Sequence, residues 1–298
     1  MEGRTVNTES LFLTICILII SSAGLKGQYQ DFIHNGLTRE FIYYSPSVIR
    51  PGAPLVFVLH GYTDDALKIQ EYSGMNAIAD QFGFAVCYPR GTVDSRGNRF
   101  WNVGYSFHKG IKTDDVGFLI ALAGFLQKKY DLNSLNTFAT GMSNGGEMCY
   151  LLACRASSTF RAVAPVAGMM MQPILESCNP HIPVPLFEIH GINDTINRFN
   201  GDISNKDGWG AYPGTLFTIG FWSRLNECNI IRIDTIPNNN LADGSFVIAE
   251  KHINSNSGNQ VWLYRIEGGG HDWPGISGNM DINTGREIWN FFNYYIQK

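Results

Sequence analysis

The segment from Thr137 to Cys149, TFATGMSNGGEMC, constrains the fold of this chain more than any other stretch. It begins with β-branched and aromatic residues typical of a strand and continues with helical character from Gly146 onward. Between them the chain turns sharply from Gly141 to Gly145, in the pattern Gly-x-Ser-x-Gly. In so tight a turn, a side chain at either outer glycine would collide with the neighbouring strand or helix. The pattern predicts that Ser143 is held out at the carboxyl end of a sheet, before a helix N-terminus that favours negative charge.

The rest of the chain alternates short apolar runs with segments of helical spacing. We expect further buried strands at Pro54–Gly61, Phe84–Gly91, Arg161–Gly168, Val184–Gly191 and Val261–Gly268. Helices are expected at Asp64–Gln81, Thr113–Tyr130, Thr215–Leu225 and Thr284–Ile296. An exposed antiparallel edge strand is expected at Asp31–Ser47, and a β-excursion at Ile230–Gln260. The pattern predicts one α/β domain over residues 28–298, with a mostly parallel sheet and helices on both faces.

The N-terminus has the pattern of a signal peptide. Arg4 precedes an apolar run from Leu11 to Ile20, which is too short to span a bilayer. Small residues follow, and we expect cleavage between Ala23 and Gln28, so residues 1–27 are predicted to be removed and the protein to be secreted or periplasmic. No membrane association is expected after cleavage.

The charge and motif content of the sequence limit the kinds of partner and cofactor that are expected. The 298 residues carry a formal net charge of −4, and only 16% of them are charged, which gives no sign of a nucleic-acid partner. The sequence has no Cys-x-x-Cys or His-Glu-x-x-His spacing, so neither a metal nor another cofactor is expected. The oligomeric state is not indicated.

Five cysteines remain after the predicted cleavage, and an odd number leaves at least one free thiol in an oxidising compartment. Cys87, Cys149 and Cys154 lie in apolar contexts and are expected to be buried small hydrophobes. Cys178 and Cys228 lie in polar loop contexts, so these two are predicted to form a disulfide.

A serine in such a turn needs a base, because a free hydroxyl is a poor nucleophile at neutral pH. Where this turn occurs in α/β-hydrolases, the chain order is serine, acid, histidine, each after a strand. Asp194 follows the strand VPLFEIHG, and His271 follows VWLYRIEG. Ser143, Asp194 and His271 are therefore the predicted catalytic residues. Asp202 and Asp207 are rival acids, whereas His60 and His190 are expected to be structural histidines near the site.

If this serine attacks an ester, an oxyanion develops on the carbonyl oxygen and needs hydrogen-bond donors. The backbone N–H of Asn144, after the serine, is one predicted donor. The backbone N–H of Tyr62, directly after His60-Gly61 at the end of an earlier strand, is the other.

Several of these segments together resemble the polyhydroxybutyrate depolymerase-like esterases, which include feruloyl and acetylxylan esterases of the carbohydrate-esterase type. The matching stretches extend over most of the chain and are LHGYTDD, YPRGT followed by WN, TDDVGFL, ATGMSNGGEM, APVAGM, EIHGINDTI and YRIEGGGHDWPG. The resemblance implies the α/β-hydrolase fold and the same triad and oxyanion residues. Cys178 and Cys228 also look like the cysteine pair of that family. Tyr62 departs from the pattern, because several members carry cysteine or a smaller residue there.

Aromatic residues near the motifs are candidates for a substrate-binding rim, where flat faces could stack on a sugar or phenolic ring. Trp101, Asn102 and Trp273 are the predicted substrate-binding residues, and Trp209 and Tyr212 are further candidates. No separate binding module is evident, which favours a soluble ester over a crystalline polyester.

The sequence thus favours a secreted serine esterase acting on feruloyl or acetyl esters of plant polysaccharide fragments. The alternative is a short-chain polyhydroxyalkanoate depolymerase. A serine peptidase and a non-catalytic carbohydrate-binding protein remain further alternatives.

Overall fold

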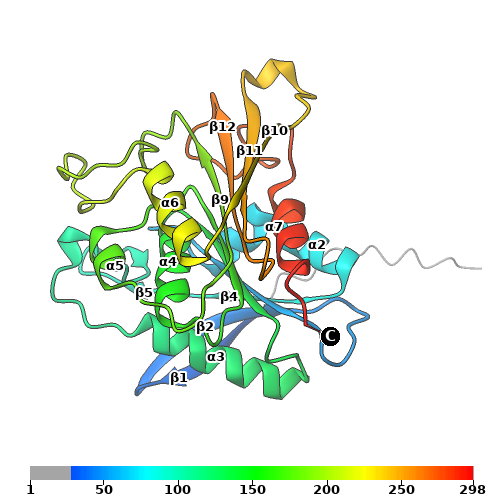
Figure 1. Cartoon of the computed structure of the whole chain (residues 1–298). Coiled ribbons are helices and arrows are strands. Elements are labelled where there is room, and N and C mark those ends of the chain that lie inside the picture. Colours follow the sequence, from blue (N-terminus) through cyan, green and yellow to red (C-terminus); the bar gives the residue numbers. More distant parts are fainter. Residues whose placement is uncertain (1–27, 298) are drawn as a thin grey trace, which may run out of the picture.

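A ten-stranded sheet organises the computed structural model, which describes residues 28–297, so the predicted signal peptide lies outside the described residues. Its strand order is β1-β2-β4-β3-β7-β8-β9-β12-β11-β10 (Figure 1). The strands are β1 (Tyr29–His34), β2 (Leu37–Tyr44), β3 (Leu55–Leu59), β4 (Ala85–Pro89), β7 (Thr137–Met142), β8 (Ala162–Val166), β9 (Leu186–Gly191), β10 (Ile230–Thr235), β11 (Phe246–Ile253) and β12 (Gln260–Glu267). A separate small hairpin pairs β5 (Thr92–Val93) with β6 (Arg99–Phe100).

The six central strands, from β4 to β12 in the sheet order, are parallel, which confirms the predicted architecture. Antiparallel strands complete the sheet on both sides, with β1 and β2 at one edge and β11 and β10 at the other. The expected β-excursion is the pair β10–β11. The single edge strand expected at Asp31–Ser47 is wrong, because Asn35 (φ 49°) and Gly36 (φ 77°) turn the chain into a hairpin. Both residue types favour the positive φ that such a turn requires.

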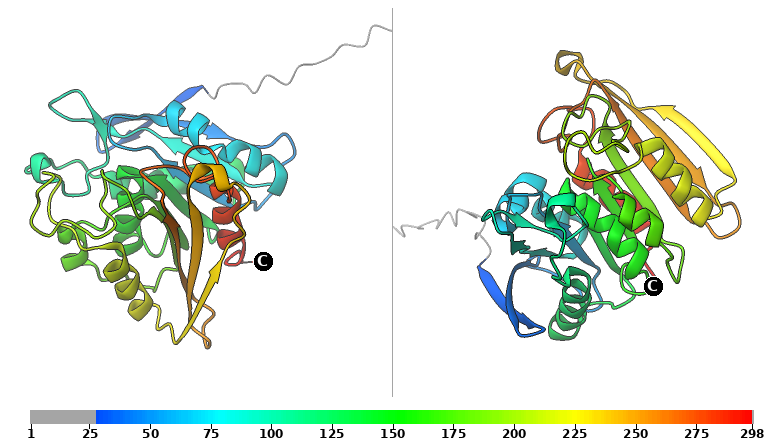
Figure 2. Two further views of the ribbon diagram at one scale, coloured as in Figure 1. Left: turned by 90° about the horizontal axis from the view of Figure 1, so that it is seen from above. Right: turned by 90° about the vertical axis from the view of Figure 1, so that its left-hand side faces the viewer.

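Helices cover both faces of the sheet (Figures 1 and 2). Residues of α1 (Ala66–Ser73), α2 (Met75–Phe82) and α7 (Thr284–Asn293) pack into the core on one face. Residues of α3 (Asp115–Tyr130), α4 (Asn144–Arg155), α5 (Gln172–Ser177) and α6 (Thr215–Leu225) pack into the core on the other. Two short 3₁₀ helices, η1 (Ser106–His108) and η2 (Leu241–Asp243), lie in loops.

The helix expected at Asp64–Gln81 is two helices. Gly74 lies between α1 and α2 with φ 62°, a left-handed conformation that ends α1 and that glycine adopts without steric cost. The other expected helices are confirmed, and Asp114 caps α3 by accepting a hydrogen bond from Gly117 N at 2.8 Å. No helix among residues 28–297 has the length and apolarity needed to cross a membrane.

The disulfide joins Cys154 to Cys178, so the predicted pairing of Cys178 with Cys228 is wrong. Cys154 lies in the last turn of α4 and Cys178 directly follows α5, and the packing of these helices brings their Cα atoms to 4.9 Å. Cys87 and Cys149 are free and buried as expected, and Cys228 is a partly buried free thiol. Helical spacing along α4 could not indicate which helix packs against its last turn.

Candidate active site

The turn between β7 and α4 confirms the predicted steric role of its glycines. A Cβ on Gly145 would stand 2.2 Å from the Leu59 carbonyl oxygen of β3, and one on Gly141 would meet the same oxygen at 2.7 Å. Ser143 itself has φ 55° and ψ −121°, a sparsely populated conformation for a residue with a side chain. The chain therefore presents the Ser143 side chain at the carboxyl end of the sheet, with its backbone N–H bonded to Val166 O at 2.9 Å.

Asp194 and His271 meet at the same end of the sheet, in the loops that follow β9 and β12. The Nδ1 atom of His271 lies 2.7 Å from Oδ2 of Asp194. The other carboxylate oxygen, Oδ1, accepts hydrogen bonds from the backbone N–H groups of Ile196 and Asn197, each at 2.8 Å. Burial opposes ionisation of Asp194, but contacts with His190 and His271 outweigh it and hold the pKa of this carboxyl well below its usual range. Asp194 is thus a fixed carboxylate facing an imidazole.

Ser143 and His271 line one pocket of about 490 Å³. The other residues that line it are Gly61, Tyr62, Thr63, Asp64, Lys68, Tyr72, Met142, Ile196 and Trp209. Within residues 28–297, no hydrogen bond joins the Ser143 hydroxyl to the imidazole. Catalytic hydrogen bonds are often long in the absence of substrate, so this arrangement is compatible with a serine and base that approach one another on binding.

The predicted oxyanion donors lie beside the serine. Asn144 is the first residue of α4, where backbone N–H groups have no partner within the helix. A Cβ placed on Gly61 would stand 3.6 Å from the Ser143 Cβ, so the loop carrying Tyr62 lies directly against the serine. The predicted donor is the backbone N–H of Tyr62, and the side-chain hydroxyl of this residue donates a hydrogen bond to Asp94 at 2.8 Å.

His60 and His190 are both fully buried, and their hydrogen bonds suit the structural role expected for them. Nδ1 of His60 donates to Gly61 O at 2.7 Å and Nε2 accepts from Gly91 N at 2.9 Å, while burial lowers the pKa of His60 to about 4. His60 is therefore neutral. Burial also disfavours charge on His190, but contacts with Asp194 and Glu188 outweigh it and raise its pKa to about 10.

The sequence did not predict a buried polar network behind the pocket. Nδ1 of His190 lies 2.9 Å from Oε1 of Glu188, and its Nε2 lies 2.8 Å from Asn197 O. Glu147, one turn into α4, accepts hydrogen bonds from the side chains of Asn144 and Asn197. The signal that could have revealed this network is the occurrence of two glutamates in otherwise apolar segments, EMCYLL and PLFEIHG.

The rival acids and most candidate rim residues have other roles. Asp207 pairs with Arg198, and Asp202 accepts a hydrogen bond from Asp207 N at 2.9 Å. Trp101 and Trp273 are fully buried, so the prediction that their faces form a substrate rim is wrong. The candidate Tyr212 is fully buried as well, whereas Trp209 does line the pocket.

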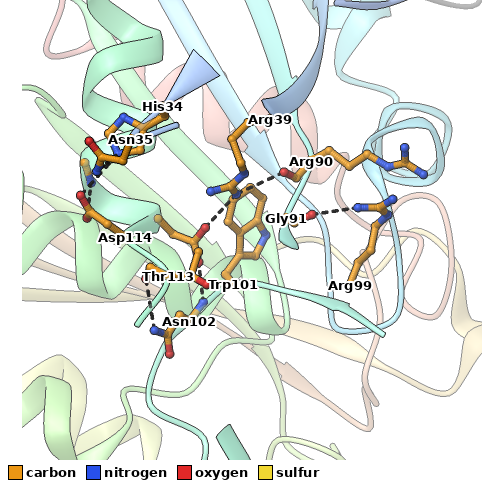
Figure 3. A network of polar contacts seen from close by, with 12 residues as sticks. His34, Asn35, Arg39, Arg90, Gly91, Arg99, Trp101, Asn102, Thr113 and Asp114 are labelled. Atoms are coloured by element: carbon orange, nitrogen blue, oxygen red, sulfur yellow. Dashed lines mark hydrogen bonds and ion pairs between the residues drawn. The ribbon is translucent and has the colours of Figure 1, made fainter. Parts of the chain in front are cut away.

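Trp101 and Asn102 instead belong to a polar network that supports the site (Figure 3). Trp101 N donates to Asn144 Oδ1 at 2.6 Å, and the indole N–H donates to His60 O at 3.0 Å. Asn102 N donates to the buried Asp115, and the Asn102 amide donates to the carbonyls of Ile111 and Thr113. Trp101 therefore holds Asn144 and the strand end before Tyr62, whereas the Asn102 amide holds the loop of Ile111 and Thr113.

Comparisons with known proteins relate this chain to esterases. Residues 39–177 match the model of a family described as "Esterase PHB depolymerase". The putative esterase NocK of Nocardia uniformis subsp. tsuyamanensis is 29% identical over 260 residues, covering 83% of this chain and 74% of that protein. Feruloyl esterase B of Piromyces equi is 26% identical over 223 residues, covering 74% of this chain and 39% of the relative.

Among solved structures, an acetyl xylan esterase from Aspergillus awamori superposes with a TM-score of 0.63 at 17% identity, covering 90% of this chain and all of that one. This likeness shows the shared fold. The family match over residues 39–177 and the named relatives support a polyhydroxybutyrate depolymerase-like, feruloyl esterase-like chain that hydrolyses esters.

Proposed function

We propose that this protein is a secreted serine esterase that hydrolyses feruloyl or acetyl esters of plant polysaccharide fragments through an acyl-enzyme. Ser143 Oγ attacks the ester carbonyl carbon while its proton moves to His271, and Asp194 orients and stabilises the imidazolium. The tetrahedral intermediate expels the alcohol, which takes the proton from His271. Water then attacks the acyl-enzyme with His271 as the base, releasing the carboxylic acid and regenerating Ser143.

The single observation that carries this proposal is the 2.7 Å contact between His271 Nδ1 and Asp194 Oδ2 at the wall of the pocket that Ser143 lines. Three residues from distant parts of the chain converge there at the carboxyl end of the sheet. The first turn of α4 and the loop at Tyr62 lie beside Ser143, which supports the proposal that their backbone N–H groups stabilise the oxyanion. Acyl transfer by a serine requires a hydroxyl, an imidazole that takes its proton and a carboxylate that orients the imidazole.

The aromatic wall of the pocket favours a flat acyl group. The rings of Tyr62 and Trp209, both lining the pocket, meet edge to face with their centroids 5.8 Å apart. Such a wall can pack against a phenolic ring, so we favour a feruloyl group over an acetyl group. Secretion is supported by the N-terminal sequence pattern and by the Cys154–Cys178 disulfide, which suits an oxidising compartment.

Hydrolysis of methyl ferulate, acetylated xylan and hydroxybutyrate oligomers by the mature protein, measured side by side, tests this proposal. We expect the highest kcat/KM on methyl ferulate. Trp209→Ala should raise KM for methyl ferulate more than KM for p-nitrophenyl acetate, whereas Trp262→Ala, near the start of β12 and at the end opposite the loop of His271, should change neither. Highest turnover on hydroxybutyrate oligomers would favour the depolymerase, and amide turnover equal to ester turnover would favour a peptidase.

A further inference from the structure

Strand β10 forms a fully exposed edge of the large sheet. It is the last strand in the sheet order, and among residues 28–297 it pairs only with β11 (Figure 2, right, yellow strand at the outer margin). All six residues from Ile230 to Thr235 are exposed. Ile231 and Ile233 lie on the same face of the strand, with 59% and 63% of their surfaces accessible. An exposed edge strand with apolar side chains is a template for pairing with another strand.

The backbone of β10 offers hydrogen-bonding groups on its outer side. Ile236 N donates to Val247 O at 2.9 Å, which fixes the alternation of the antiparallel ladder between β10 and β11. Even-numbered residues of β10 therefore direct their backbone groups toward β11. The N–H and C=O groups of Ile231, Ile233 and Thr235 point outward.

The charges on β10 complement a second copy of the same strand. Arg232 and Asp234 share one face of the strand, and among residues 28–297 neither forms an ion pair. In an antiparallel pair of β10 strands centred on Ile233, each Arg232 lies opposite the Asp234 of the other copy. Ile233 then pairs with Ile233 through the outward backbone groups, and Arg232 and Asp234 occupy the positions where opposed side chains approach most closely.

We propose that two copies of this chain associate through β10 in this register, which joins their two sheets into one continuous sheet. The charges select the register. Sliding the strands by two residues in one direction sets Arg232 opposite Arg232, and in the other direction it sets Asp234 opposite Asp234. Both alternatives preserve the outward hydrogen bonds but oppose like charges, which destabilises a strand pair.

The interface is small, so the dimer is reversible. Six residues a side form a contact at the low end of protein interfaces, below about 1,200 Å² in total, where association is weak and transient. The mass of the protein is thus expected to depend on its concentration. Association adds no residue to the pocket that Ser143 lines, so the proposed dimer and the proposed esterase activity are separable.

A charge-reversal cycle tests the proposal on the mature protein. Sedimentation should show a shift from monomer to dimer between about 1 μM and about 1 mM, the range of weak affinities. Arg232→Asp or Asp234→Arg alone opposes like charges at two places in the dimer and should weaken association about tenfold. The double variant R232D/D234R restores opposite pairs and should restore the dimer. Wild-type protein that stays monomeric throughout, or a double variant as weak as either single one, would overturn the proposal.

Matched isoleucines at the two edges of the sheet supply the control. Ile233→Lys places two lysines opposite one another at the centre of the interface and should abolish the dimer. Ile33→Lys, at a residue that is 74% exposed on the opposite edge strand β1, should leave it unchanged. Amide exchange gives a second measure, since the amides of Ile231 and Ile233 should become protected at high concentration only. Equal loss in both lysine variants, or protection confined to other segments, would place the interface elsewhere.

Discussion

The Glu147 carboxyl on α4 lies 3.2 Å from the side-chain nitrogen of Asn197, which belongs to the loop after β9. The second Glu147 oxygen accepts a hydrogen bond from the Asn144 amide at 3.3 Å, and Asn197 N donates to Asp194. One buried carboxyl therefore connects the turn that carries Ser143 to the loop that carries the proposed acid.

Burial raises the pKa of Glu147 to about 8 from its usual 4.5, although hydrogen bonds from neighbouring residues oppose the shift. Between these two values the folded protein holds a proton that the unfolded chain releases, so stability falls as the pH rises. The slope is at most about 1.4 kcal/mol per pH unit. Glu147→Gln removes this titration, and in urea unfolding its stability relative to wild type should increase steadily from about pH 5 to about pH 8. Glu176→Gln, at an exposed position on α5, should run parallel to wild type; a parallel curve for Glu147→Gln would show that Glu147 is ionised throughout.

Ser143→Ala removes the proposed nucleophile. Turnover of p-nitrophenyl acetate should fall by something on the order of 10⁶-fold, because nucleophile and base act as a unit. The variant should keep its unfolding midpoint, since the hydroxyl forms no hydrogen bond that supports the fold among the described residues. Ser158→Ala, at an exposed position beyond the end of α4, should retain full activity. A loss below about tenfold in Ser143→Ala would remove Ser143 from the mechanism.

Reduction of the Cys154–Cys178 disulfide should destabilise the protein. The bond closes a loop with a sequence separation of 24 residues, and the chain-entropy model gives about 3.5 kcal/mol for a loop of that size. Cys154→Ser should lower the free energy of unfolding by this amount, while Cys228→Ser should have little effect. Peptide mapping without reduction should recover a linked peptide containing Cys154 and Cys178; a peptide linking Cys178 to Cys228 would contradict this pairing.

The Arg39–Asp115 ion pair is buried beside the segment of Trp101, because Asn102 N donates to Asp115 at 2.8 Å. Their side chains are 4% and 1% exposed, and Arg39 donates to Asp115 at 2.8 Å. Asp115→Asn leaves the guanidinium buried without its counter-charge, which should cost about 3–5 kcal/mol of stability in denaturant unfolding. Asp114→Asn, the neighbouring exposed cap of α3, should be nearly neutral, because asparagine caps a helix as well as aspartate does. Equal effects of the two substitutions would mean that the cap, and not the ion pair, stabilises this region.

Local chemistry made the elbow and the central sheet predictable. The tight turn is indicated by the glycines at positions 141 and 145, and a buried strand by a continuous apolar run such as Leu55–Leu59. Both features can be recognised from a few consecutive residues. Chain order placed Asp194 and His271 after their strands, and the structure brings those two side chains together. These features depend on neighbours in sequence or on a general rule about parallel sheets.

Features that depend on packing between distant segments were not predictable. Trp273 lies two residues beyond His271, yet its ring turns into the core and not toward the pocket. The partner of Cys178 is set by how α4 and α5 pack, and the break at Gly74 competes with a continuous helical pattern. The role of Glu147 emerges only when β9 and its loop lie beside α4.

The close approach of the glycine turn to Leu59 also fixes the distance between Ser143 and the backbone amide of Tyr62. Leu59 ends β3 only three residues before Tyr62, so the Leu59 carbonyl is a common reference for Ser143 and for the Tyr62 amide. The contact at this point is between backbone atoms. Substituting a side chain there by a longer or shorter one therefore does not change the distance between the two segments. The loops around the pocket can therefore differ in sequence and fit different esters, while the distance between the proposed nucleophile and the proposed oxyanion donor stays the same.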